Sequence, residues 1–389
     1  MELIPTTRWA RVDDWSPNSP LQVKEYLKAK GYRIPKHRIT KAETTNEEAL
    51  LEILRTHASD SVLSKVVEAR HLGKAIGYLY DTYLGRDGRL HPRYTFLPKT
   101  GRLSSKAPSI MNIPQGRKGD IMKEVADAIR GAIIPTPGYI LAEFDWKAIE
   151  ALLVGYFAND PAYMRLSKLG VHAYMACQGL GIPVDLTQSD GDLLALFGRV
   201  KKENPTEYAA FKKTNHAFNY GQGIYNLAKD LKCDLPTAKH YVDIIEKAAP
   251  LVAKWKEDTR RRAHAEGRLV NPFSYSMSFF EIYTKRDGEW VLGKEASECL
   301  AFLPQSTAAA MLREVLVDLG EHPDEGVKFN LLAPTHDSIT LEILPAYERE
   351  IMVLVRDMME RSWGELGGLS VETEAKVGMA LSDMHLYKW

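Results

Sequence analysis

The sequence has little cysteine and no long apolar stretch, and each absence excludes a class of protein. Only Cys177, Cys233 and Cys299 occur, far apart and without a CxxC pair. This spacing argues against a disulfide framework and favours buried thiols in a reducing compartment. No run approaches eighteen apolar residues, and the N-terminus lacks the charged-then-apolar pattern of a targeting segment. The chain is therefore expected to be soluble and intracellular, without a membrane partner.

Net charge is also absent, because 51 Lys and Arg residues balance 51 Asp and Glu residues. A neutral chain by itself argues against a nucleic-acid partner, but the charges are unevenly distributed. Residues 86–130 hold ten basic and four acidic residues, whereas 313–389 hold seven basic and fifteen acidic residues. Such separation suits a protein with one phosphate-binding surface, although uneven solvated faces would give the same pattern. Neither a GxxxxGK[ST] P-loop nor a GxGxxG fingerprint is present.

A chain of 389 residues is too long for one compact core, so two or three subdomains are expected. Caps, among them Ser19 and Asn46, and helical spacing predict helices in four segments: 19–85, 161–269, 300–319 and 346–363. Strand-like alternation ends at Asp145, surrounds Asp337 as in a hairpin, recurs in 271–292 and returns at the C-terminus. The predicted fold class is α+β, with a sheet assembled from chain-distant segments.

Asp145 and Asp337 each lie at the tip of a strand-like run. The first ends the run Gly138–Asp145 and precedes a predicted amphipathic helix, in which Glu150 belongs to the first turn. Two carboxylates held close can bind a pair of Mg²⁺ ions about 3.5–4 Å apart, as phosphoryl transfer demands. Simpler explanations exist for both: Asp145 as a helix cap, and Asp337 as an ordinary turn residue.

A helix midway between the two aspartates carries Tyr208, Lys212, His216 and Tyr220 at four-residue intervals on one face. Asn204 and the following proline mark its start. A lysine on this face could contact the β- and γ-phosphates of a nucleotide, with aromatic rings against the base. A solvated lysine beside surface aromatics is the alternative. Taken together, the acid pair and the basic helix indicate a nucleotidyl transferase.

A polar loop from Thr100 and Arg102 to Asn112 combines a glycine turn, hydroxyls, an arginine and an amide. Such a composition suits contacts to a nucleic-acid backbone, although any polar loop could share it.

In chain order, these segments resemble the polymerase domain of family A DNA polymerases, the bacterial DNA polymerase I type, of bacterial or phage origin. Phe144–Glu150 is similar to motif A of that family, Lys212–Gly221 to motif B and His336–Asp337 to motif C. The resemblance spans most of the chain and also includes Pro304–Ala309.

The resemblance implies a right-hand fold with an antiparallel palm sheet and helical fingers and thumb. The implied divisions are an N-terminal segment 1–18, thumb 19–95, palm 96–157, fingers 158–295 and second palm segment 296–389. No upstream region is long enough for an exonuclease domain, so neither proofreading nor 5′-nuclease activity is expected.

The resemblance also implies roles for single residues. Asp145, Asp337 and Lys212 would be catalytic, and the two aspartates with the carbonyl of Trp146 would hold two Mg²⁺ ions, for which Mn²⁺ would substitute. The implied nucleotide-binding residues are His172, Lys212, His216, Tyr220 and Glu150, with Glu150 excluding a ribonucleotide. The implied primer–template contacts are Thr100, Arg102, Asn112, Gln305 and His336.

The chain departs from the family pattern at three of these places. Tyr208 stands where the family usually carries arginine, and Arg199 cannot replace it on the same helix because Pro205 intervenes. His216 replaces an aromatic Phe or Tyr, and Ser338 replaces a glutamate after the motif C aspartate. Nucleotide affinity and fidelity are the properties that these changes affect.

The predicted activity is template-directed, DNA-directed DNA polymerisation by a monomer in a bacterial or phage-infected cytoplasm. Primer–template DNA, dNTPs and replication accessory proteins are the expected partners. Two alternatives remain: a single-subunit RNA polymerase, against which Glu150 argues, and a non-catalytic DNA-binding relative, against which the retained Asp145, Asp337 and Lys212 argue.

Overall fold

The computed structural model describes residues 15–37, 42–80, 84–96, 98–113, 121–335 and 337–389. The chain forms two compact units. Unit 1 comprises residues 1–93 and 105–133, and unit 2 comprises 94–104 and 134–389. Two of the three chain boundaries between them fall within the short strands β1 (Arg93–Thr95) and β2 (Ser104–Lys106), and the third falls between residues 133 and 134. Helices and antiparallel strands are both present, so the predicted α+β class is confirmed.

The helices of unit 1 begin at the caps that the sequence predicts. Ser19 caps α1 (Pro20–Ala29), and Asn46 caps α2 (Glu47–Thr56) through its side chain. Asp60 accepts the backbone N–H of Leu63 at the start of α3 (Ser61–Tyr80). A 3₁₀ turn, η2 (Ile110–Asn112), and α4 (Ile121–Gly131) complete the unit. Its core consists of Val23, Tyr26, Leu27, Ile34, Leu50, Ile53, Leu63, Val66 and Val67.

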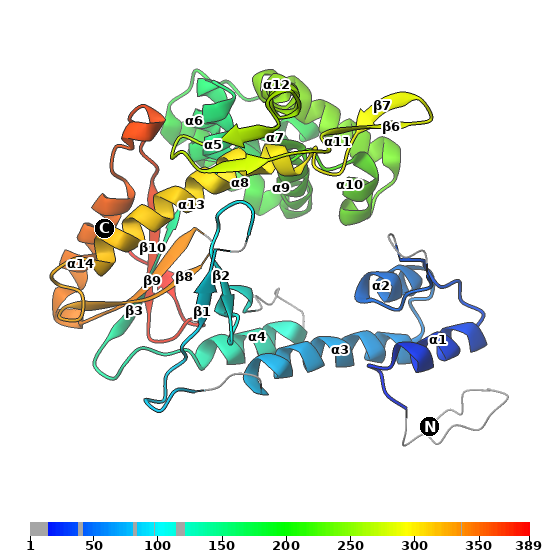
Figure 1. The fold of residues 1–389 in the computed structure, drawn as a ribbon, viewed down its shortest axis with the longest axis horizontal. Helices are drawn as coiled ribbons and strands as arrows, with labels where there is room; N and C mark the ends of the chain where they lie inside the picture. The colour runs from blue at the N-terminus through cyan, green and yellow to red at the C-terminus, as the bar shows by residue number, and fades with distance from the viewer. Residues whose placement is uncertain (1–14, 38–41, 81–83, 97, 114–120, 336) are drawn as a thin grey trace. The chain divides into compact units, whose positions relative to one another are not determined.

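Unit 2 contains an antiparallel sheet whose strands come from distant parts of the chain (Figure 1). The strand order is β11-β10-β3-β9-β8. The strands are β3 (Ile140–Trp146), β8 (Phe329–Thr335), β9 (Ser338–Ile343), β10 (Thr373–Gly378) and β11 (His385–Leu386). The β8–β9 hairpin predicted around Asp337 and the C-terminal strand are both present.

The two faces of this sheet differ in polarity because alternate residues of each strand point to opposite sides. Ala142, Phe144 and Trp146 of β3 enter an apolar core, together with Ile339, Leu341 and Ile343 of β9. Residues of α13 (Glu298–Gly320) and α14 (Glu348–Met359) join the same core. The intervening residues form the opposite, polar face: Glu143, Asp145, Ser338, Thr340, Glu342, Glu374 and Lys376.

The helix that follows β3, α5 (Ile149–Phe157), is buried on several sides rather than amphipathic as predicted. Ile149, Leu152 and Leu153 contact the core of the sheet, whereas Ala151 and Val154 belong to a second core formed by the helical part of unit 2. A helix between two cores has no solvated face, and its first polar side chain, Glu150, is held by partners described below.

The predicted helical region 161–269 is confirmed. Its helices are α6 (Pro161–Leu169), α7 (Val171–Leu180), α8 (Asp190–Glu203), α9 (Pro205–Asn219), α10 (Ile224–Leu231), α11 (Leu235–Ala248) and α12 (Pro250–Glu266). Two small hairpins follow, β4 (Arg268–Val270) with β5 (Ser276–Ser278), and β6 (Tyr283–Arg286) with β7 (Glu289–Leu292). Asp287 and Gly288 turn the second hairpin with positive φ. Two further 3₁₀ turns are η3 (Pro345–Tyr347) and η4 (Gly364–Leu366).

No helix in the described part of the chain is both long and apolar enough to cross a membrane.

Candidate active site

The sheet brings Asp145 and Asp337 to neighbouring positions. Asp145 of β3 lies directly opposite Ser338 of β9, and Asp337 precedes Ser338 in the turn between β8 and β9. The two carboxylates are close enough for the charge of Asp337 to raise the pKa of Asp145. Asp145 is not a helix cap, because α5 begins at Ile149 after the left-handed residue Ala148. The capping explanation of Asp145 is therefore wrong.

The Asp145 carboxylate lies in an environment that disfavours its charge. Burial raises its pKa to about 7, and the charges of Asp337, Glu143 and Glu374 add to the effect. Its Oδ1 atom is buried and has no hydrogen-bond partner among the described residues. A cation bound here would stabilise the ionised form and satisfy this oxygen. Within the described ranges, no group of three or more His, Cys, Asp or Glu side chains could hold a metal.

Two further acids on the polar face were missed by sequence reasoning. Glu374 of β10 lies opposite Asp145, and Glu143 precedes Asp145 by two residues on the same face. Ser338, where the family pattern has glutamate, instead donates its hydroxyl to the Thr335 carbonyl oxygen, 2.9 Å away. The alternation in β3 could have revealed Glu143, but the position of Glu374 depends on a strand register that the sequence does not specify.

The buried charge of Asp145 should reduce stability in the metal-free protein. A carboxyl whose pKa is raised in the folded state contributes stability at low pH, and this contribution is lost as pH rises toward about 7. With a chelator present, Asp145→Asn should therefore stabilise the fold at pH 8 by on the order of 2–4 kcal/mol, and by less at pH 5. Urea unfolding at both pH values measures this. An equal gain at both pH values would contradict the assignment.

Helix α9 presents the predicted cationic face. Phe211 and Phe218 are buried, and this turns Lys212 and His216 to the surface. No carboxylate pairs with Lys212 among the described residues. The His216 ring packs edge-on against the Tyr220 ring, with centroids 4.9 Å apart. A cavity of about 360 Å³ lies beside His216 and Tyr220 and extends to Gln222.

His172 of α7 faces the same helix. Burial lowers its pKa to about 4, and the neighbouring charges of Lys212 and His216 lower it further. Its Nδ1 lies 3.5 Å from the Asn215 side-chain nitrogen, and its ring contacts the Tyr208 ring edge-on. His172 is therefore neutral at pH 7 and offers hydrogen bonds rather than charge.

Glu150 hydrogen-bonds to Arg102, an implied DNA contact, and to Tyr220, an implied nucleotide contact. Its two carboxylate oxygens accept from the Arg102 guanidinium and from the Tyr220 hydroxyl. Gln305 of α13 also hydrogen-bonds Tyr220. The pKa of Tyr220 is raised, first by burial and then by the Glu150 charge, so its hydroxyl stays a donor. These bonds tie the start of α5, five residues after Asp145, to the end of α9.

The remaining predicted primer–template contacts are Thr100, Asn112 and His336. Thr100 lies in a loop fixed to α13, where the Arg313 guanidinium donates to the Gly101 carbonyl oxygen at 2.8 Å. Asn112 belongs to unit 1, is exposed and donates to the Ser109 hydroxyl at 2.8 Å. His336 lies outside the described residues.

A lysine that the sequence did not single out also contacts α9. The ammonium group of Lys256, on α12, lies 3.5 Å from the centroid of the Phe218 ring. Burial lowers the pKa of Lys256 to about 8, and the neighbouring Arg260 charge lowers it further. No heptad or motif in the sequence distinguishes Lys256 from the other lysines of α12.

Comparison with known proteins gives a consistent result. The model of DNA polymerase family A matches residues 6–384. A thermostable DNA polymerase I of Thermus thermophilus is 26% identical over 344 residues, which cover 85% of this chain and 37% of that protein. DNA polymerase I of Helicobacter pylori is 26% identical over 383 residues, which cover 91% of this chain and 39% of that protein. The chain thus spans about two fifths of the length of these curated relatives.

A solved structure shares the fold. The POL domain of Pol1 from M. smegmatis, in complex with DNA primer-template and dNTP, superposes with a TM-score of 0.76 at 21% sequence identity. The match covers 95% of this chain and 61% of that one. The right-hand polymerase fold expected from the sequence is thereby confirmed.

Proposed function

Because the chain belongs to DNA polymerase family A, we propose that it is a template-directed DNA polymerase. It extends the 3′-hydroxyl of a primer with dNTPs and releases pyrophosphate. The observation that carries the proposal is the proximity of the Asp145 and Asp337 carboxylates at one end of the sheet. Glu150, five residues after Asp145, accepts from Tyr220 at the end of the helix that presents Lys212.

Family A polymerases generally use divalent metal ions. In this chain, Asp145, Asp337 and the carbonyl of Trp146 would hold Mg²⁺, two ions in the active complex, with Mn²⁺ as a substitute. The uncompensated charge and unpartnered oxygen of Asp145 support this assignment. When bound, the metal would neutralise the triphosphate and lower the pKa of the attacking hydroxyl.

The cationic face of α9 would bind the triphosphate. Lys212 supplies a charge that no carboxylate of the described residues neutralises, and the neutral His172 would donate a hydrogen bond beside it. His216 and Tyr220 line the neighbouring cavity, where their rings would pack against the nascent base pair. The 3′-oxygen then attacks the α-phosphate, and the bond to the leaving pyrophosphate breaks.

Glu150 would select the sugar. Its carboxylate is fixed by Arg102 and Tyr220, so it occupies a defined position instead of moving aside for a 2′-hydroxyl. Arg102 and Gln305 would contact the primer–template from this cluster, and Thr100, Asn112 and His336 would add further contacts.

We assign residues 19–95 to the thumb, 96–157 and 296–389 to the palm and 158–295 to the fingers. The five-stranded sheet in the assigned palm and the continuous helical region in the assigned fingers support these divisions.

Primer extension with each nucleotide set tests the function. A labelled primer–template, magnesium and dNTPs should give full-length product, and EDTA should prevent it. Replacing dNTPs by NTPs should give little product, since Glu150 restricts the sugar. Efficient use of NTPs would favour the RNA polymerase alternative. No extension with either set, despite DNA binding, would favour a non-catalytic relative.

A further inference from the structure

On the face of α9 that carries Lys212, position 208 is a neutral tyrosine, although a cation there could also bind the triphosphate. Tyr208 lies one helical turn before Lys212, and residues four apart on a helix are neighbours on its surface. The metal ions would neutralise part of the negative charge of a nucleoside triphosphate, and of the two protein groups described beside it only Lys212 is charged, because His172 is neutral.

The helix before α9 brings a cation to this position. Helix α8 ends at Glu203 and α9 begins at Pro205, so the chain bends between them. The bend places the last turn of α8 beside the first turns of α9, with the Lys201 Nζ atom 5.6 Å from the centroid of the Tyr208 ring. Pro205 separates Arg199 from α9, as the sequence indicates, but a different residue of α8, Lys201, contacts the Tyr208 ring across the same break.

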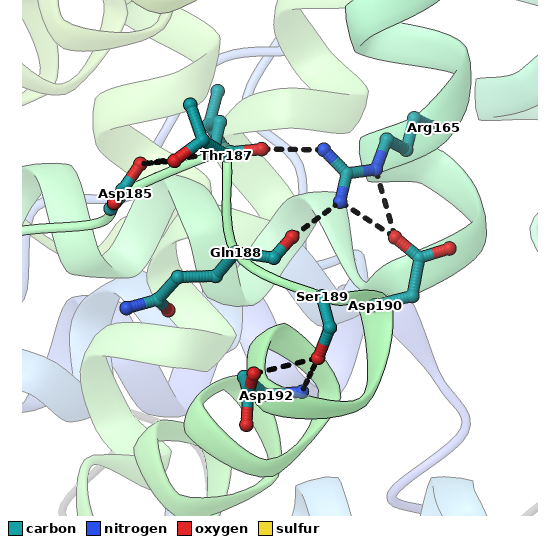
Figure 2. Close-up of polar contacts among 8 residues, drawn as sticks. Arg165, Asp185, Thr187, Gln188, Ser189, Asp190 and Asp192 are labelled. Atoms are coloured by element: carbon teal, nitrogen blue, oxygen red, sulfur yellow. Dashed lines mark hydrogen bonds and ion pairs between the residues drawn. The ribbon is translucent and has the colours of Figure 1, made fainter.

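Contacts at its N-terminal end and burial along its inner face hold α8 in place. Figure 2 shows the Arg165 guanidinium of α6 bound to the Asp190 carboxylate and to the Gln188 carbonyl oxygen. The shortest distance to Asp190 is 2.7 Å, and the guanidinium also donates to the Leu186 carbonyl oxygen. Ser189 caps the helix by accepting from the Asp192 N–H. Leu193, Phe197 and Val200 bury the inner face of the helix. Lys201 thus projects from a fixed helix rather than from a mobile loop.

The surroundings of Lys201 favour an anion. Lys201 and Lys212 are both exposed. Lys201 contacts the Tyr208 ring and Lys212 follows Tyr208 by one helical turn, and no carboxylate pairs with either lysine among the residues that the structure describes. The positive charges of two neighbouring lysines repel each other, and an anion bound between them would relieve this repulsion. A lysine in the last turn of a helix also complements the helix dipole, but Lys202 does this equally, and only Lys201 contacts the aromatic ring.

We propose that Lys201 binds the terminal phosphate of the incoming dNTP, with Tyr208 as the ring that holds its ammonium group beside Lys212. The proposal rests on the proposed function and names a second phosphate-binding cation, supplied by a different helix from the first. Because Tyr208 is neutral, α9 has no positive charge at that position, and Lys201 of α8 supplies one beside it.

Single-nucleotide incorporation kinetics test the proposal, with Lys202→Gln as a matched control from the same turn. Lys201→Gln should raise the KM for dNTP about tenfold and change kcat less than threefold, because one charge-assisted contact is lost. Lys202→Gln should stay within about twofold of the wild type. Both residues are exposed, so neither variant should change the melting temperature.

A second substitution that restores dNTP binding tests whether a cation is needed at this particular place. Adding Tyr208→Arg to Lys201→Gln places a cation on α9 itself and should lower the KM again by at least about threefold. An unchanged KM in Lys201→Gln, or an equal rise in Lys202→Gln, would overturn the proposal.

Binding measurements with a dideoxy-terminated primer test which phosphate is contacted. The wild type should bind dNTP more tightly than the matching dNDP, and Lys201→Gln should lose most of this difference. An equal loss of affinity for both ligands would overturn the assignment to the terminal phosphate. The outcomes are distinguishable from failure of the proposed function, since a wild-type protein that extends no primer refutes the function itself.

Discussion

Primer extension is expected to fall by at least about a thousandfold when Asp145 or Asp337 is replaced by asparagine. Asparagine preserves the shape of each side chain and removes the negative charge that would hold a divalent ion. The loss should be of this size because the same ion would both bind the triphosphate and activate the attacking hydroxyl. Single-turnover extension with saturating dNTP measures it, and a gel-shift assay should show primer–template affinity within about threefold of the wild type.

The matched control is Asp357→Asn, because the Asp357 side chain is 63% exposed and, among the described residues, accepts from its neighbour Arg356. This variant should extend primers at the wild-type rate. Asp145→Asn should in addition be the more stable protein at pH 8, so loss of activity cannot be attributed to unfolding. Retention of a tenth or more of the activity in either active-site variant would show that the acid pair is not the metal site.

Lys212→Gln is expected to lower kcat/KM for dNTP by about a hundredfold. Lys212 lies on the exposed face of α9 without a carboxylate partner among the described residues, so its charge is available to the triphosphate. A charge fixed on a helix stabilises the negative charge that develops on the leaving pyrophosphate, so both kcat and KM should change. Steady-state incorporation of one nucleotide measures the two constants separately.

Lys213→Gln is the control for this variant. Lys213 is the next residue of the same helix, is also exposed, and its ammonium group lies 3.3 Å from the Asp230 carbonyl oxygen. Its replacement should change kcat/KM by less than about threefold. If the two variants lose activity equally, the charge of α9 acts as a whole, and the specific role of Lys212 is refuted.

Local sequence signals predicted much of the secondary structure. Ser19, Asn46 and Pro205 mark helix starts that the structure contains. The alternation around Asp337 predicted its hairpin. These features depend on residues within a few positions of one another, which is why a sequence pattern suffices for them.

The sequence failed where one element contacts two partners. Helix α5 was predicted to be amphipathic, but it lies between two cores, and this depends on packing against segments more than a hundred residues away. The contacts of Glu150 with Arg102 and Tyr220 have the same origin, since they join residues 48 and 70 positions apart. The Lys201–Tyr208 contact depends on the bend between two helices, which composition does not reveal.

The sequence by itself determined which chemical groups this protein carries and which lie at strand ends and on helix faces, because caps, turns and side-chain periodicity are local properties. The tertiary structure alone decided which of these groups are neighbours and how strongly each is charged. Strand pairing places Asp145 beside Asp337 and Glu374, and burial raises its pKa to about 7. Desolvation and Coulomb interactions depend on distance in space, and folding alone sets that distance.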